Sequence, residues 1–267
     1  MKSRLLTIVC LLLSTFPASA DPLVARFESN MGDFDVLLDS IAAPRSVDNF
    51  SAYANRGAYD VTIIHRSTTY NPLDIQIVQG GGFALVSNTL SPIPSDPPIL
   101  LEAGRANALG TLAMARTSAP DSATSQWFFN LTGNLGLDFN YAVFGSVLGA
   151  GQNVIEAIGA VPVYDASIAL GPVYGQLPLL ADSISIDSLV LINKIRVEPF
   201  TITSLTHTSA AIEIRWTALS TNSPVRVERR ENLGQGSWTV VSSNNTDGIF
   251  RDTNAPTGHA FYRLVIE

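Results

Sequence analysis

Short apolar runs separated by glycine and proline dominate the chain from Leu23 to Ile192. Runs of this length and spacing are typical of strands in a barrel or a sandwich. The first two runs, within Leu23–Leu38, flank Asn30-Met31-Gly32, a turn-like sequence, so a β-hairpin is expected there. Further strands are expected at Val61–Ile64, Ile75–Val78, Gly110–Ala115, Gln126–Leu131, Ala142–Val147 and Ser183–Ile192.

Two segments have the apolar spacing of a helix instead. Apolar residues recur every three or four positions from Val47 to Ala54, after Pro44 and before Gly57. Proline suits the first turn of a helix and glycine its end, so the boundaries agree with the periodicity. A second helix is expected from Asn153 to Ile158.

The character of the chain changes around Lys194 to Pro199. Beyond this point there is no convincing helical pattern, and strand-like runs alternate with Asn, Gly, Pro and Thr. Strands are expected there at Ala211–Trp216, Val225–Arg229, Trp238–Val241 and Ala260–Ile266. Such a pattern predicts a small β-sandwich of about 70 residues. The expected divisions are therefore a leader at 1–20, a first domain at 21–196 and a sandwich at 197–267.

The first twenty residues have the pattern of a secretory signal peptide. Lys2 and Arg4 precede an apolar run, Leu5–Leu13, and Ala18-Ser19-Ala20 supplies small residues for cleavage. A membrane anchor is the alternative, but the run is about half of the roughly 20 residues that a spanning helix needs. The protein is therefore expected to be exported, to the periplasm or the extracellular space, without stable membrane insertion.

Removing that leader changes both charge and redox chemistry. The formal charge of −7 becomes −9, since the leader carries two basic and no acidic residues. The single cysteine is lost with it, so no disulfide is expected in the mature chain. An acidic chain without a basic cluster is not expected to bind nucleic acid.

Most patterns for hydrolytic, phosphate or metal chemistry are missing. The three histidines are not accompanied by a G-x-S-x-G elbow, and His65, beside Arg66 on a strand, is expected to be structural. Gly80-Gly81-Gly82 lacks the signature of a phosphate-binding loop, so a bulge or a close backbone approach is expected. The carboxylate pairs Asp33/Asp35 and Asp182/Asp187 have no regular ligand spacing and no accompanying His or Cys, and no metal site is expected.

Five blocks of sequence resemble the cyclophilin family of peptidyl-prolyl cis/trans isomerases, and its bacterial secreted branch most of all. They are "AAPRSVDNFSAYANRGAYDVTIIHR" from Ala42, "QGGGF" from Gln79, "PPILLEA" from Pro97, "GTLAMARTSAPDSATSQWFFN" from Gly110 and "LDFNYAVFG" from Leu137. The blocks follow in the family's order. The resemblance implies a mainly β fold, an eight-stranded antiparallel barrel with two helices. It also implies that the protein acts on proline-containing polypeptides and needs no cofactor.

The resemblance also implies a site. Arg66 matches the family's catalytic arginine, although a structural salt bridge is the alternative role on the residues alone. The positions matched to peptide binding are Gln79, Ile77, Ala115, Arg116, Gln126, Phe128, Leu137 and Tyr141. Phe128 is implied as the floor of the proline pocket, and strand alternation turns it away from Trp127 and Phe129.

Two departures leave a rival function open. The connection from Ser67 to Val78 is longer than is usual in the family and puts Gln76 where an aromatic residue is expected. Gly136 likewise replaces an aromatic residue. If the long connection misplaces Arg66 or fills the groove, the protein would be a binding module for proline-containing peptides with weak catalysis.

The last 70 or so residues resemble fibronectin-type-III-like modules more weakly, through strand spacing and through Trp238, Phe250 and Tyr262. Fold analogy alone assigns no function. Two roles stay open: binding a surface, glycan or partner, or stabilising and spacing the enzyme. In a third reading the sandwich is the functional part and the barrel a scaffold.

Overall fold

The computed structural model describes residues 22–68, 75–208, 210–232, 234, 236–256 and 259–266. The expected signal peptide, residues 1–20, and the middle of the long connection, residues 69–74, lie outside the described residues. The chain divides into two compact units, one from Pro22 to Glu198 and the other from Pro199 onward. Each unit is described by itself.

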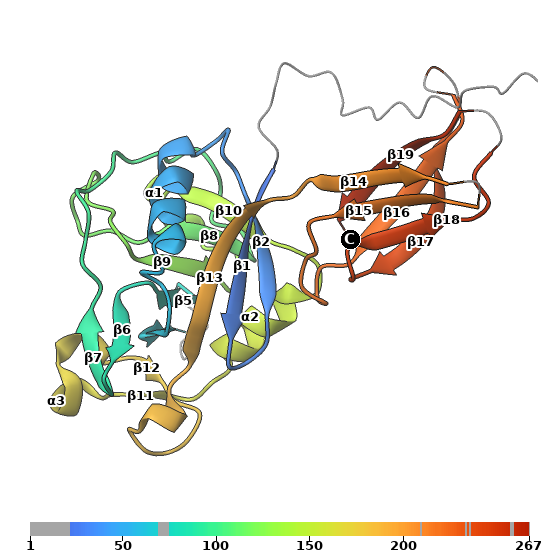
Figure 1. Ribbon diagram of the computed structural model, residues 1–267. Coiled ribbons are helices and arrows are strands. Elements are labelled where there is room, and N and C mark those ends of the chain that lie inside the picture. Colours follow the sequence, from blue (N-terminus) through green and yellow to red (C-terminus); the bar gives the residue numbers. More distant parts are fainter. Residues whose placement is uncertain are drawn as a thin grey trace, which may run out of the picture. The chain divides into compact units, whose positions relative to one another are not determined.

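The first unit is built on one curled antiparallel sheet (Figure 1). Its strands, in the order in which they pair, are β4 Arg66–Ser67, β5 Ile77–Gly80, β9 Trp127–Asn130, β8 Thr111–Met114, β10 Val143–Val147, β2 Phe34–Leu38, β1 Leu23–Ser29, β13 Leu191–Pro199, β3 Thr62–Ile63, β6 Phe83–Val86 and β7 Thr89–Pro92. A separate pair is formed by β11 Val163–Tyr164 and β12 Leu177–Pro178.

The sheet closes into a barrel because β3 and β4 are two parts of one bent strand. On one side of this strand the His65 N–H donates to Gln79 O at 3.1 Å, and on the other the Ile64 N–H donates to Val190 O at 3.0 Å. The strand is thus hydrogen-bonded to β5 on one side and, on the other side, to β13 and the residue before it. Counting β3 and β4 once, and setting aside the β6–β7 hairpin, gives the predicted eight-stranded barrel.

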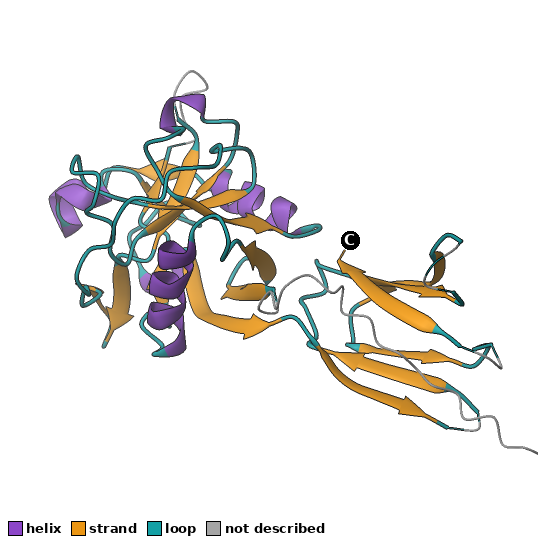
Figure 2. Cartoon of the chain, turned by 90° about the horizontal axis from the view of Figure 1, so that it is seen from above, coloured by secondary structure: helices purple, strands orange, loops and turns teal. Residues whose placement is uncertain are grey.

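Two helices cover the barrel core, as the apolar spacing predicts. Helix α1, Pro44–Asn55, has Pro44 in its first turn, and α2 spans Gly151–Gly159. Both bury their apolar faces in the main core, α1 through Val47 and Phe50 and α2 through Ile155. The barrel strands run between the two helices in both views (Figures 1 and 2). The one-turn helix α3, Ser167–Leu170, was not predicted.

The expected strand at Ser183–Ile192 is wrong over most of its length. Residues 183–190 instead form a turn around a short 3₁₀ helix, Ile186–Ser188. Ser188 explains the difference, because its hydroxyl donates to Ser183 O at 2.5 Å and accepts from the Ser185 N–H at 3.0 Å. Such local side-chain bonds compete with strand pairing. Strand β13 begins at Leu191 and continues to Pro199, through the expected change of character near Lys194.

The three consecutive glycines mark a close backbone approach. A Cβ on Gly80 would lie 2.5 Å from the Trp127 ring, and one on Gly81 would lie 2.6 Å from the same side chain. Gly81 also has a φ of +72°, which disfavours other residues. This segment therefore lets the fully buried Trp127 ring lie against the backbone that follows Gln79.

The second unit consists of two three-stranded sheets. One contains β14 Ile202–His207, β15 Ile212–Trp216 and β18 Ile249–Asp252, and the other contains β17 Thr239–Asn245, β16 Val225–Arg230 and β19 Phe261–Ile266. The two sheets meet at Asp252, which accepts hydrogen bonds from Arg229 and from the Tyr262 hydroxyl, both at 2.7 Å. β14 and β18 were not among the predicted strands. None of the helices in the described ranges is long and apolar enough to cross a membrane.

Candidate active site

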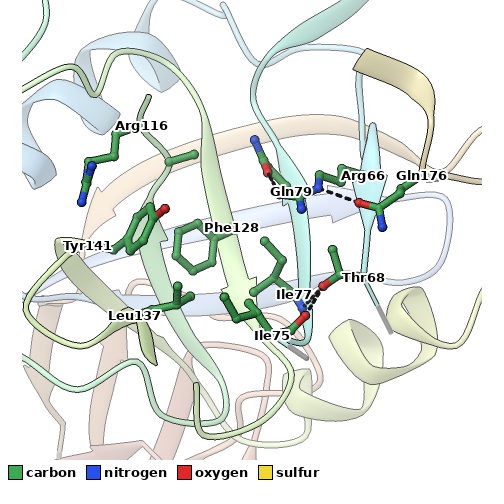
Figure 3. Close-up of a pocket in the computed structure, with 11 residues that line it drawn as sticks. Arg66, Thr68, Ile75, Ile77, Gln79, Arg116, Phe128, Leu137, Tyr141 and Gln176 are labelled. Carbon is green, nitrogen blue, oxygen red and sulfur yellow. Dashed lines mark hydrogen bonds between the residues drawn. The ribbon is translucent and has the colours of Figure 1, made fainter. Parts of the chain in front are cut away.

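A pocket of about 530 Å³ opens on the first unit where β4, β5 and β9 lie side by side (Figure 3). This volume is in the usual range for a ligand site. The pocket brings together eight of the nine positions implied by the resemblance. Its lining residues are Arg66, Thr68, Ile75, Ile77, Gln79, Ala115, Arg116, Phe128, Leu137, Tyr141 and Gln176.

Arg66 stands at the polar edge of the pocket, held by two amides. Its Nε donates to Gln176 Oε1 at 2.9 Å, and its Nη1 donates to Gln79 Oε1 at 3.3 Å. In the part of the chain that the structure describes, the side-chain partners of Arg66 are these two neutral amides. Arg66 and Gln79 are cross-strand partners in the β4–β5 pairing, so the long connection between them does not displace one from the other.

A hydrogen bond to Gln126 fixes the side chain of Gln79. Its Nε2 donates to Gln126 Oε1 at 2.8 Å, which fixes the amide so that its oxygen faces Arg66. Gln126 is the one implied position that does not line the pocket; it supports Gln79 instead.

His65 is buried behind the same strand, as expected for a structural histidine. Burial first, and then the charge of Arg66, lower the pKa of His65 to about 4, although a hydrogen bond with Gln126 opposes the shift. The ring packs edge-on against Phe83, with 5.0 Å between centroids. His65 is therefore neutral near pH 7.

The pocket floor is a small apolar cluster separate from the main core. Phe128 is 2% exposed and packs with Ile77, Leu137, Ala113 and Val143. Trp127 and Phe129, its chain neighbours, belong to the main core on the other face of β9. The predicted alternation of these three aromatic residues is confirmed, and Phe128 is the one that faces the pocket.

The far wall combines an aromatic ring with a second cation. Tyr141 lies edge-on to Phe128, with 5.4 Å between ring centroids, and the Arg116 guanidinium lies 4.7 Å from the centre of the Tyr141 ring. Arg116 Nε donates to Asn140 O at 2.6 Å, which fixes the stacked position. The Ala115 N–H already donates to Gln126 O at 2.9 Å, so backbone pairing with a peptide would have to use other groups of this segment.

Thr68 and Ile75, at the described ends of the long connection from Ser67 to Val78, form part of one wall of the pocket. The Thr68 N–H donates to Ile77 O at 3.0 Å, so the β4–β5 pairing extends beyond Ser67. Ile75 lines the pocket near Ile77, and Gln76, between them, does not. The side chain of Asn134 binds both backbone groups of Gln76 at 3.0 Å, fixing this segment against the loop that leads to Leu137.

Three lining residues were not predicted: Thr68, Ile75 and Gln176. Strand alternation could have pointed to Ile75, two positions before Ile77. No sequence signal points to Gln176, because it is 110 positions from Arg66. A Cβ on Gly136 would meet no atom within 4 Å, so there is open space at this position, where an aromatic residue was expected. In the described ranges no three His, Cys, Asp or Glu side chains gather as a metal site.

Comparison with known proteins gives a family for this arrangement. A family model described as cyclophilin type peptidyl-prolyl cis-trans isomerase/CLD matches residues 24–174. A peptidyl-prolyl cis-trans isomerase of Acinetobacter baylyi is 38% identical over 169 residues, covering 61% of this chain and 85% of that protein. Peptidyl-prolyl cis-trans isomerase A of Dickeya dadantii is 39% identical over 174 residues, covering 60% and 86%.

Among solved structures, a cyclophilin type peptidyl-prolyl cis-trans isomerase of Cryptosporidium parvum, crystallised in the presence of the dipeptide Ala-Pro, is 20% identical. It covers 66% of this chain and 98% of its own, with a TM-score of 0.48. The family model alone covers more than half of the chain and includes every implied site residue. The chain therefore belongs to the family of cyclophilin type peptidyl-prolyl cis-trans isomerases.

Proposed function

We propose that this protein, a peptidyl-prolyl cis-trans isomerase of the cyclophilin type, acts on X-Pro bonds of exported polypeptides through Arg66. The observation that carries the proposal is the position of the guanidinium, which two neutral amides hold at the edge of an apolar pocket. The proline ring would enter over Phe128, between Ile77 and Leu137, and Arg66 would face the bond that rotates.

The chemistry needs no covalent intermediate. Resonance gives the C–N bond partial double-bond character and a rotation barrier of ~18–20 kcal/mol. As the bond twists, the proline nitrogen loses conjugation and regains a basic lone pair. A donor aimed at that nitrogen therefore binds the twisted state more strongly than either planar isomer, which is what lowers a barrier.

Arginine suits this task. The guanidinium is always charged and presents several donors in one plane, of which the amides of Gln79 and Gln176 use only two. Arg66 is exposed at the pocket edge. A bound peptide would cover it, and excluding water strengthens the field of a fixed charge.

The alternative is a pocket that binds proline-containing peptides with little turnover. A protein substrate whose refolding is limited by X-Pro isomerisation, which takes ~10–100 s uncatalysed, separates the two functions. A substoichiometric amount of an isomerase shortens the slow phase, whereas a binding module leaves its rate unchanged or slows it. An unchanged slow phase would favour the alternative.

Export is proposed on the pattern of the leader, and the resemblance of the five blocks to the family's bacterial secreted branch agrees with it. The Ala18-Ser19-Ala20 sequence predicts cleavage after Ala20, so that the mature chain starts at Asp21. N-terminal sequencing of the protein recovered from the periplasm or the medium checks this prediction. Recovery of exported protein that retains Met1 would contradict it.

The second unit is proposed to be a fibronectin-type-III-like module that is independent of catalysis. Among the residues that the structure describes, none that lines the pocket comes from it. A chain ending at Glu198 should therefore be soluble and should retain the turnover of the full chain per folded molecule. Peptide exchange and thermal unfolding of both chains test this. A truncated chain that unfolds cooperatively but has lost most of its turnover would show that the second unit completes the site.

A further inference from the structure

Gln176 holds Arg66 from the side opposite Gln79. It lies just beyond residue 174, where the match to the family model ends. Gln176 Oε1 accepts the hydrogen bond from Arg66 Nε at 2.9 Å, a shorter contact than the 3.3 Å bond from Arg66 Nη1 to Gln79. Figure 3 shows the guanidinium between these two amides. The tighter of the two contacts on Arg66 thus comes from outside the five blocks of sequence.

Gln176 is exposed, but its backbone is fixed. The Ser67 N–H, next to Arg66, donates to Gln176 O at 2.9 Å. On either side of Gln176 the chain is anchored by Tyr174 and Leu177, which are 5% and 0% exposed. Both pack in a cluster with Ile63, on the strand that leads to Arg66. The amide is therefore presented to Arg66 from a segment tied to the same strand.

The chemical nature of the partner matters as much as its position. A carboxylate in this place would order the guanidinium equally well but would offset part of its positive field. An amide oxygen accepts the Nε–H bond and carries no net charge. It also occupies the Nε edge, which leaves Nη2 and one Nη1–H directed elsewhere.

We propose that Gln176 is a positioning residue for isomerisation, a neutral clamp that orients Arg66 toward the rotating bond without weakening its charge. The inference rests on the proposed function, since it concerns the same arginine. It predicts that both the hydrogen-bonding capacity and the neutrality of residue 176 are needed.

Two variants separate these requirements. Gln176→Leu removes the acceptor, and we expect the maximal exchange rate of a saturating Ala-Pro peptide to fall about tenfold, equivalent to about 1.4 kcal/mol. The dissociation constant of the peptide should change little, because the amide acts on Arg66. Gln176→Glu keeps an acceptor but adds a charge, and a comparable fall is expected near pH 7.

Acid should rescue the second variant. A carboxyl group at this position would face Arg66, whose charge would hold the pKa of the carboxyl below its ordinary value of about 4.3. As the pH falls through that pKa the group becomes neutral, and the rate relative to wild type at the same pH should recover. The comparison with wild type at the same pH also corrects for protonation of His65, whose pKa burial lowers to about 4. Gln176→Leu should show no recovery.

Asn193→Asp supplies the matched control, because it adds a carboxylate at an exposed position of β13 that does not line the pocket. Its exchange rate should equal that of the wild type. Weaker peptide binding with an unchanged maximal rate in the Gln176 variants would make Gln176 a peptide contact and overturn the proposal. A lowered melting temperature with normal turnover would make its role structural and overturn it equally.

The NMR signal of the Arg66 Nε–H gives a readout that does not depend on activity. It should be resolved and protected from exchange with water in the wild type and in Gln176→Glu, and lost in Gln176→Leu. An inactive wild type would refute the proposed function, whereas the clamp itself fails if this signal is unchanged in Gln176→Leu.

Discussion

Arg66→Ala should lower the turnover of an Ala-Pro peptide by ~10²–10³, the range found when one preorganised electrostatic donor is removed. The affinity for the peptide in its planar forms should change little, because the guanidinium acts on the twisted bond. The protein should remain folded, since Arg66 is exposed and both of its side-chain partners are neutral amides. Exchange rates, peptide affinity and thermal unfolding of the same preparations test these three expectations.

Two further variants sharpen the Arg66 experiment. Arg66→Lys should restore turnover only in part, because a compact ammonium cannot bind the two glutamines and reach the substrate nitrogen at once. Arg56→Ala is the matched control: Arg56 is also exposed, directly follows the end of α1, pairs with Asp96 at 2.6 Å and does not line the pocket. Its loss should leave turnover unchanged. Near-normal turnover in folded Arg66→Ala would remove Arg66 from the mechanism.

Phe128→Ala should weaken peptide binding and turnover together and should also destabilise the protein. The side chain is 2% exposed and forms the centre of the apolar floor, so its removal leaves a cavity. A loss of about 3–5 kcal/mol in the free energy of unfolding is expected for a phenylalanine packed in this way. Urea unfolding gives the stability, and peptide titration at low temperature gives the affinity of the folded fraction.

Phe129 provides the comparison for this variant. It is 1% exposed and lies next to Phe128 in β9, but it packs in the main core. Phe128→Leu and Phe129→Leu are milder changes in which both proteins should fold. Only the first should weaken peptide binding. Equal affinity in the two folded leucine variants would place Phe128 in a purely structural role.

The pattern of apolar and polar residues predicted the barrel because glycine and proline residues mark the ends of its strands and helices. Gly32, at a φ of +122°, turns the first hairpin, and Pro44 begins α1 at the expected position. Alternation along β9 also separated Phe128 from Trp127 and Phe129, although only the resemblance indicated which face is the pocket. The strand predicted at Ser183–Ile192 was wrong because Ser185 and Ser188 form local bonds that no apolar period reveals.

The candidate site was predictable where it lies on paired strands and was missed where it depends on distant segments. Arg66 and Gln79 belong to recognisable blocks and lie opposite each other in β4 and β5. Gln176 directly precedes the two-residue strand β12. Its position beside Arg66 therefore depends on the pairing of Leu177 with Tyr164, which the sequence does not indicate. Gln126 was expected in the groove, but its amide is turned toward Gln79 instead.

If the Arg66 pocket rotates X-Pro bonds rather than only binding them, a catalytic amount of the chain from Asp21 should accelerate the cis–trans exchange of a short Ala-Pro peptide. NMR exchange between the cis and trans signals of the peptide measures this rate. We expect exchange far faster than the uncatalysed interconversion, which takes tens to hundreds of seconds. Exchange that stays at the uncatalysed rate, at protein concentrations where the peptide is bound, would show that the pocket binds the peptide without rotating the bond.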